Sequence, residues 1–124
     1  MADKLAIVGF ASSTRADAPL TEAGWDIWGC NELGMIIQGS WSAWFNLHKL
    51  NEIAPENLQW MAKQTVPVYM LDRHPDIPMS QKFPLDEVMA AFPRHYWCST
   101  IAYMLALGML KGYKTIGIYG VDMA

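Results

Sequence analysis

Cysteine is scarce in this sequence. Its 124 residues include only two cysteines, Cys30 and Cys98, which lie far apart and have no closely spaced Cys or His partner. Zinc sites and disulfide frameworks need such spacing, so we predict no metal cluster and interpret both cysteines as buried free thiols. Free thiols are typical of a reducing compartment and no secretory signal is recognisable, so we expect a cytoplasmic protein.

Long apolar runs and excess positive charge are also absent. The longest apolar run, residues 101–110, is about half the length that a membrane-spanning helix needs, so no membrane partner is expected. Nine basic residues against 12 acidic residues give a net charge of −3, which argues against duplex nucleic acid as a partner. The chain is rich in Trp and Met, which favours either a Met-rich core or an aromatic partner surface.

Short apolar runs alternate with helical segments along the chain. The runs show no strict polar alternation, which suits strands that are buried on both faces of a sheet. This order predicts an α/β fold in one domain over residues 1–124: a Rossmann-like, mostly parallel sheet with helices on both faces. Three prolines within residues 75–85 predict a loop there. The expected strands cover residues 4–10, 25–30, 41–47, 66–71 and 115–121, and the expected helices cover residues 55–64, 86–92 and 100–111.

The clearest helix begins near Ser99 and ends before Gly112. Ser99 or Thr100 can cap its N-terminus, and Gly112 can end it. The helix is apolar on all sides, which predicts that it is buried. The strand that follows is expected to be central in the sheet, yet the sequence ends at Ala124 directly after it. We therefore expect a domain that lacks its C-terminal elements, and an uncovered sheet edge that favours a homo-oligomer.

Polar residues follow the expected strands at the point where each strand ends. In a parallel sheet, ligands bind outside the carboxyl ends of the strands. These residues therefore predict a binding site at one edge of the sheet. They are Ser12, Ser13 and Thr14 after the first strand, Asn31 and Glu32 after the second, His48 after the third, Asp72, Arg73 and His74 after the fourth, and Asp122 after the last.

The stretch IVGFASSTR predicts a phosphate-binding turn at the end of the first strand. It lacks the G-x-G-x-x-G and G-K-[ST] patterns of common phosphate loops. Backbone N–H groups and the hydroxyls of Ser12, Ser13 and Thr14 can still hold a phosphate, with Arg15 balancing its charge. The alternative interpretation is a serine-rich turn without a ligand.

Two further stretches predict ligand contacts. The helix start at Ser99 and Thr100 offers free N–H groups and a favourable dipole to an anion, although both residues can equally serve as caps. In the stretch CNE, Asn31 can recognise a base or a ribose through its amide, with Glu32 beside it. A simple turn is the alternative for this pair.

Candidate groups for proton transfer lie near the same edge. His95 is close in sequence to the helix start and His74 follows the fourth strand, so either is a candidate general base. Asp122 is a candidate for holding a sugar hydroxyl or a divalent ion such as Mg²⁺. The alternatives are surface histidines and a polar turn, and the sequence identifies no other cofactor.

Three stretches carry a family resemblance. KLAIVGFASS, DIWGCNE and WCSTIAYMLALGMLKGYKTIGIYGVDM are similar to a Rossmann-like group. This group includes bacterial sialyltransferases that use CMP-sialic acid and archaeal-type 6-hydroxymethylpterin pyrophosphokinases. Most of the chain also resembles uncharacterised bacteriophage proteins. The resemblance implies that Ser12, Ser13, Asn31, Ser99 and Thr100 contact a nucleotide. The catalytic His of those sialyltransferases follows the last stretch, beyond this sequence.

Two hypotheses about function follow. The first is a phage-type Rossmann-like protein that binds a nucleotide or nucleotide-sugar and, if it is an enzyme, a glycosyltransferase-like or pyrophosphokinase-like transferase. The second is a non-catalytic phage protein that sequesters a nucleotide signal, or that blocks a host defence protein through exposed Trp41, Trp44 and Trp60. If the chain is phage-encoded, either protein would work in the cytoplasm of the host cell.

Overall fold

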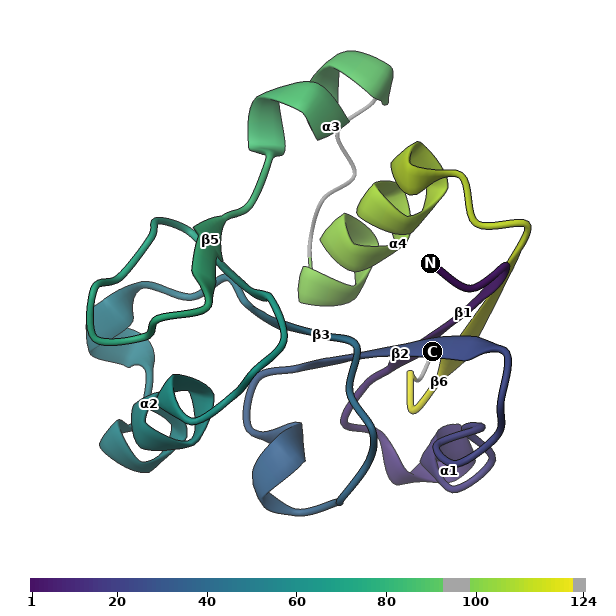
Figure 1. Cartoon of the computed structure of the whole chain (residues 1–124), viewed down its shortest axis with the longest axis horizontal. Coiled ribbons are helices and arrows are strands. Elements are labelled where there is room, and N and C mark those ends of the chain that lie inside the picture. Colours follow the sequence, from purple (N-terminus) through teal and green to yellow (C-terminus); the bar gives the residue numbers. More distant parts are fainter. Residues whose placement is uncertain (93–98, 122–124) are drawn as a thin grey trace.

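The computed structural model describes residues 1–92 and 99–121, except for the side chain of Ser13. Its centre is a six-stranded sheet in the order β5-β4-β3-β2-β1-β6, in which every neighbouring pair is parallel (Figure 1). This confirms the predicted parallel α/β fold. The strands are β1 (Lys4–Val8), β2 (Trp25–Cys30), β3 (Ala43–Asn46), β4 (Val68–Met70), β5 (Ser80–Lys82) and β6 (Thr115–Tyr119).

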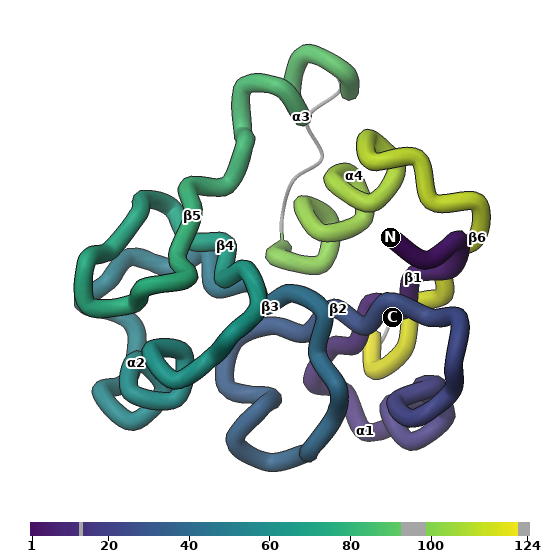
Figure 2. The backbone as a smooth tube through the Cα atoms, viewed as in Figure 1, coloured from purple at the N-terminus to yellow at the C-terminus, as the bar shows by residue number. Residues whose placement is uncertain are grey.

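Helices cover both faces of the sheet, as the sequence predicts. In Figure 1, α3 and α4 lie on one side of the sheet, and α1 and α2 lie on the other. Figure 2 shows the chain returning through α4 after α3, which brings the last strand β6 beside the first strand β1. The helices are α1 (Ser12–Arg15), α2 (Pro55–Ala62), α3 (Leu85–Ala91) and α4 (Thr100–Lys111), with 3-10 turns η1 (Leu33–Met35) and η2 (Leu50–Glu52).

The sheet separates two apolar cores. Because successive side chains of a strand point to opposite faces, β1 contributes to both cores. Leu5 and Ile7 join the core that includes Met104 of α4, whereas Ala6 and Val8 join the opposite core with α2. These four side chains are fully buried, and only Lys4 at the start of β1 is exposed, which explains why the strand shows no polar alternation in the sequence.

Tryptophan fills much of the core beneath α2. Trp44 is fully buried, and its ring centroid lies 4.8 Å from that of Trp41 and 4.5 Å from that of Trp60. Gly29 makes this packing possible, because a side chain at that position would overlap the Trp44 ring. Trp41 and Trp60 are themselves partly buried in the same core. These rings are therefore core residues in this structure, and not the exposed surface that the protein-blocking hypothesis needs.

The prediction of a loop over residues 75–85 is wrong in part, because Ser80–Lys82 forms the strand β5. This strand pairs in parallel with β4, from Val68 opposite Ser80 to Met70 opposite Lys82. The prolines that suggested a loop lie outside the three paired residues, so none of them removes an N–H group from the pairing. As an edge strand, β5 needs hydrogen bonds on one side only, and it carries the exposed polar residues Gln81 and Lys82.

The predicted central position of the last strand is also wrong. Among the described strands, β6 pairs with β1 alone and forms an edge of the sheet. The prediction that α4 is buried on all sides is also wrong, because the helix packs against β1, β3 and α3 with only part of its surface. Met109 and Leu110 near its C-terminus are 52% and 40% exposed.

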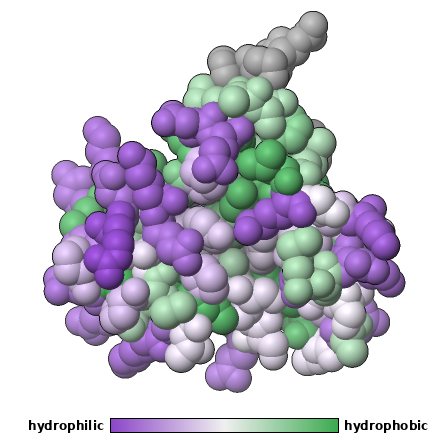
Figure 3. Space-filling model, turned by 45° about the horizontal axis from the view of Figure 1, so that its top comes forward, coloured by the Kyte–Doolittle hydropathy of each residue, from purple (hydrophilic) through white to green (hydrophobic). Residues whose placement is uncertain are grey.

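Apolar side chains at the surface are visible in Figure 3, where they gather between two more hydrophilic areas. Surface apolar atoms are normal in a folded protein, and they do not by themselves indicate a membrane. Within the described part of the chain, no helix combines the length and the apolar character that crossing a membrane requires.

Candidate functional site

A cleft of about 510 Å³ lies at the carboxyl ends of the strands. It is lined by the segments that follow β1, β2, β3 and β6, together with the start of α4. This is the edge of the sheet at which the sequence predicts a site. The lining residues are Gly9, Phe10, Ala11, Cys30, Asn31, His48, Ser99, Thr100, Ile101, Gly120 and Val121.

Two glycines bring the backbones of the first and last strands together in the cleft. Gly9 N donates a hydrogen bond to Tyr119 O (2.7 Å), and Ala11 N donates one to Gly120 O (2.8 Å). A Cβ atom on Gly9 would lie 2.6 Å from Gly120 O, and one on Gly120 would overlap Gly9 O. Gly120 also has a φ of 68°, which favours glycine. The two chain segments can approach this closely only because both positions lack a side chain.

The polar residues after β1, for which the sequence predicts a turn, form the short helix α1 (Ser12–Arg15), and two of their side chains hold the exit of β1 in place. Thr14 Oγ1 accepts a hydrogen bond from Gly120 N (2.8 Å), and the Arg15 guanidinium donates one to Phe10 O (3.0 Å). Ser12 is exposed, and the side chain of Ser13 lies outside the described part of the structure. The backbone of Gly9, Phe10 and Ala11 lines the cleft here. The phosphate-binding role of Ser12, Ser13, Thr14 and Arg15 therefore stays a prediction.

Asn31 lies in the cleft at the end of β2 with a φ of 56°, a left-handed conformation that asparagine tolerates. Its backbone is fully engaged: Asn31 N donates to Phe45 O (2.9 Å), and Asn31 O accepts from Trp44 Nε1 (3.2 Å) and Asn57 Nδ2 (3.1 Å). Its side-chain Oδ1 is buried and has no hydrogen-bond partner within the described residues. A buried acceptor without a partner costs stability, so it points to a donor that a ligand or water supplies.

Two more buried asparagines lie beside Asn31, and the sequence did not single them out as site residues. Asn46 ends β3 and Asn57 belongs to α2, and both are fully buried. Within the described part of the protein, Asn46 Nδ2 and Asn57 Oδ1 have no hydrogen-bond partner. Asn46 could have been noticed, because it ends a buried apolar strand in the same way as Asn31. Asn57 gives no such signal, since it occupies an ordinary helical position.

The start of α4 forms the opposite wall of the cleft. Ser99 caps the helix, and its Oγ accepts a hydrogen bond from Ala102 N (3.4 Å). Gly112 ends the helix in the left-handed conformation, with a φ of 88°. Both predicted helix ends are thus confirmed. Since α4 is a helix of 12 residues, its free N–H groups and dipole at Ser99 and Thr100 present positive potential to the cleft.

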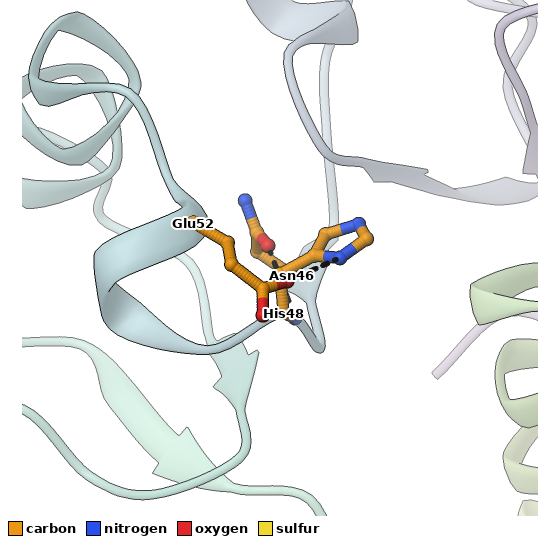
Figure 4. Close-up of polar contacts among 3 residues, drawn as sticks. All are labelled: Asn46, His48 and Glu52. Carbon is orange, nitrogen blue, oxygen red and sulfur yellow. Dashed lines mark hydrogen bonds and ion pairs between the residues drawn. The ribbon is translucent and has the colours of Figure 1, made fainter.

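The histidines divide between two pockets. His48, one of the polar residues that the sequence places after the expected strands, lies at the exit of β3 and lines the main cleft. His48 also lines a second pocket of about 300 Å³, which contains His74. Figure 4 shows His48 with its two polar neighbours: its backbone N donates to Asn46 Oδ1 (3.4 Å), and its Nδ1 lies 3.9 Å from Glu52 Oε2. His95 and Asp122 lie outside the described residues, so their roles stay predictions.

Cys30 contributes a neutral group to the cleft. Burial, with a smaller contribution from the nearby Glu32 carboxylate, raises the pKa of its thiol from 9.0 to about 12. The thiol therefore stays protonated at neutral pH and is not a nucleophile. Cys30 is a buried free cysteine, as predicted, whereas Cys98 lies outside the described residues. Glu32 is exposed and directly precedes η1.

A protein-built metal centre is not evident in residues 1–92 and 99–121. No group of three or more His, Cys, Asp or Glu side chains in these ranges could hold a metal ion. A divalent ion at this site would therefore depend on oxygen atoms of a bound ligand, or on residues such as Asp122 that lie outside these ranges.

Solved structures share this fold. The sialyltransferase CstII from Campylobacter jejuni in complex with cytidine-5'-monophosphate superposes with a TM-score of 0.65 and 19% identity, covering 96% of this chain and 68% of that chain. The same enzyme in complex with CMP-3FNeuAc gives a TM-score of 0.63 and 18% identity, covering 96% and 64%. This chain thus has the fold of about two thirds of that transferase. No protein-family model and no curated protein matches the sequence.

Proposed function

We propose that this chain is a nucleotide-sugar-binding domain of the transferase type. The observation that carries the proposal is the cleft at the carboxyl ends of the strands, which is lined both by Asn31, whose buried amide oxygen has no partner among the described residues, and by the start of α4. A cleft of about 510 Å³ is within the size range of small-molecule sites. The shared fold with a sialyltransferase solved with CMP supports the nucleotide class of the ligand.

The residues of the cleft have complementary roles in this proposal. The nucleotide phosphate lies at the N-terminus of α4, where Ser99 and Thr100 offer N–H groups and hydroxyls. Asn31 Oδ1 accepts a hydrogen bond from the base or the ribose. The segment with Ser12, Ser13, Thr14 and Arg15, which forms α1, closes the other side; Thr14 Oγ1 accepts a hydrogen bond from Gly120 N, and the Arg15 guanidinium donates one to Phe10 O. Glu32 follows Asn31 in the chain and is exposed.

The reaction class that fits this site is transfer of a glycosyl group from the nucleotide to an acceptor hydroxyl. His95 accepts the proton of that hydroxyl, because the other candidate, His74, already uses its Nδ1 to accept a hydrogen bond from Asp76 N (3.2 Å). Asp122 holds a sugar hydroxyl or a Mg²⁺ ion. A pyrophosphoryl transfer uses the same phosphate contacts, and the products distinguish the two reactions. Positioning of two substrates in one site supplies much of the rate enhancement in such reactions.

A thermal-unfolding panel tests the proposed ligand class. The wild-type protein is unfolded with CMP, other nucleoside monophosphates, nucleotide-sugars and cyclic nucleotides, with and without Mg²⁺. A ligand present at a hundred times its dissociation constant stabilises the protein by about 2.7 kcal/mol. We expect a cytidine nucleotide or its sugar conjugate to raise the melting temperature, and a panel without any shift would contradict the proposal.

Two substitutions test whether Asn31 and Ser99 contact the nucleotide. Asn31→Gly removes the amide and keeps the left-handed backbone, and Ser99→Ala removes the cap hydroxyl. Both changes should weaken nucleotide binding. Gln81→Ala on the remote edge strand β5 is the control and should leave it unchanged. Equal affinity in all three variants would rule out the assigned contacts.

A binding protein without catalysis, encoded by a phage, is the alternative that the sequence raised. Sequestration of a nucleotide signal predicts tight binding without a product, whereas a transferase releases a nucleotide from its sugar conjugate. The protein-blocking form of this alternative predicts no nucleotide binding at all, and the burial of Trp44 does not favour it. A product assay on the first ligand that binds therefore distinguishes the three cases.

A further inference from the structure

The second pocket has the composition of a binding site for an anionic sugar. We propose that it holds a second substrate, a sugar that carries a carboxylate or a phosphate, and that His48 lies between this substrate and the nucleotide. This inference rests on the proposed function, because it assigns the acceptor side of the same site. The pocket is lined by His48, Lys49, Leu50, Met70, Leu71, Asp72, Arg73 and His74.

The position of the pocket follows from the parallel sheet. It lies at the carboxyl ends of β3 and β4, next to the main cleft, which lies at the ends of β1, β2, β3 and β6. His48 lines both spaces, and among the described lining residues it is the one that the two spaces share. Two ligands that occupy the two spaces would therefore both lie against His48, which is the arrangement that a two-substrate transfer needs.

The charge of the pocket favours an anion. Lys49 and Arg73 are exposed cations, and within the described part of the chain neither forms an ion pair. Asp72 is the one carboxylate among the described residues of the lining, so their fixed charges sum to a positive value; Glu52 lies outside this lining, 3.9 Å from His48 Nδ1. An Arg guanidinium can bind a carboxylate or phosphate through two parallel hydrogen bonds, and a nearby Lys adds a point charge.

His74 is held in an orientation that suits the same ligand. Ser80 Oγ accepts a hydrogen bond from His74 N (2.8 Å) and donates one to His74 O (2.9 Å), which fixes the backbone of this residue against β5. Asp76 N donates to His74 Nδ1 (3.2 Å). Because Nδ1 is an acceptor, the neutral ring carries its proton on Nε2 and is a hydrogen-bond donor there.

The apolar part of the lining suits a sugar ring. Leu50 and Leu71 are exposed beside the cations, and Met70 is buried behind them. A pocket that combines apolar walls with a few placed polar groups binds a ring through its face and orients it through its substituents. The pocket of about 300 Å³ is at the lower end of the size range for small-molecule sites, so it fits a monosaccharide better than a longer chain.

Histidine side-chain NMR tests the proposal. The imidazole resonances of the wild-type protein are assigned with His48→Gln and His74→Gln variants, and are then followed during titration with CMP, glucose 6-phosphate, glucuronate and glucose. We expect both anionic sugars to shift His74 and His48, CMP to shift His48 without His74, and glucose to shift neither. Comparison of the titrations with glucose 6-phosphate and with glucuronate shows whether the pocket prefers a phosphate or a carboxylate.

The outcomes separate the two proposals. If the anionic sugars leave His74 unshifted, or if glucose shifts it equally, the second-substrate pocket is overturned while nucleotide binding can still hold. If the anionic sugars shift His74 but CMP leaves His48 unshifted, the pocket stands as an anionic-sugar site and the proposed function fails.

A charge-removal pair gives an independent measurement. Lys49→Ala combined with Arg73→Ala should weaken glucose 6-phosphate binding at least about tenfold. Lys63→Ala combined with Lys111→Ala removes the same charge from exposed positions outside both pockets and is the control. CMP affinity should be equal in the two double variants. Equal sugar affinity in the two double variants would overturn the proposal.

Discussion

The two ends of the sheet differ in how their polar groups are satisfied. At the amino ends of the strands, Asp26 Oδ2 accepts hydrogen bonds from Tyr113 Oη (2.6 Å) and Ala2 N (3.0 Å). At the carboxyl ends, the amides of Asn31, Asn46 and Asn57 each retain a buried atom without a partner in the described residues. Paired polar groups stabilise a fold, whereas unpaired buried groups reduce its stability and are retained where a ligand satisfies them. The comparison therefore assigns structure to one end and binding to the other.

The close approach of Gly9 and Gly120 should be the most sensitive point of the binding end. Gly120→Ala places a Cβ against Gly9 O in an unfavourable backbone conformation, so we expect a loss of about 2–4 kcal/mol in unfolding free energy. Urea denaturation measures it.

Gly112→Ala is the matched control for this substitution. Gly112 has a φ of 88° and nothing within 4 Å of an added Cβ atom, so it should lose only about 1 kcal/mol, the cost of the backbone conformation alone. Equal losses in the two variants would show that the glycine contact does not hold the turn and β6 together.

Tyr113→Phe removes a hydrogen bond at the paired end. We expect the unfolding free energy to fall by about 1–2 kcal/mol, because the Asp26 carboxylate keeps its contact with Ala2 N but loses the phenol. Nucleotide affinity should not change, since Tyr113 lies at the opposite end of the sheet from the cleft. If the variant is as stable as the wild-type protein, the hydrogen bond between Tyr113 and Asp26 does not stabilise the fold.

Asn46→Val should affect ligand binding rather than stability, the reverse of what we expect for Tyr113→Phe. It removes a buried, unpaired Nδ2 and introduces an apolar side chain that suits a strand, and it also removes the long hydrogen bond (3.4 Å) that Oδ1 accepts from His48 N. We expect the unfolding free energy to stay equal or to rise by up to about 1 kcal/mol, while nucleotide binding weakens. A clear loss of stability, measured in the same urea titration, would mean that this amide is already satisfied in the free protein.

The Cys30 thiol predicts a change that is visible only at alkaline pH. Its pKa is raised from 9.0 to about 12 in the folded protein, so the unfolded chain loses the proton first. The stability due to this protonated thiol is fully present below pH 9 and is lost as the pH rises toward 12. Urea titrations across this range should show a steeper fall for wild type than for Cys30→Ala, and parallel curves would contradict the assignment.

The sequence predicted β2 and α4 well because their ends carry explicit signals. Asn31 and Glu32 follow the apolar run of β2, and Ser99 and Gly112 mark the two ends of α4. The clustering of strand ends in one cleft was also predictable, since it follows from a parallel sheet.

Other features depend on tertiary pairing that no local pattern shows. β5 has three residues between prolines, and only its register with β4 makes it a strand. The edge position of β6 depends on strand order, which residue patterns alone do not fix. The shared position of His48 between two pockets needs the packed arrangement of β3, β4 and α4.

The central claim is that the carboxyl ends of the strands, where buried amide atoms lack partners, bind the nucleotide, whereas the paired polar groups at the amino ends stabilise the fold. The most direct test measures both the unfolding free energy and the CMP affinity of Asn31→Gly and Tyr113→Phe. We predict that Asn31→Gly loses at least about tenfold in affinity with little change in stability, and that Tyr113→Phe loses stability at unchanged affinity. If Asn31→Gly binds CMP as tightly as wild type, or if Tyr113→Phe weakens binding equally, the division between the two ends is wrong.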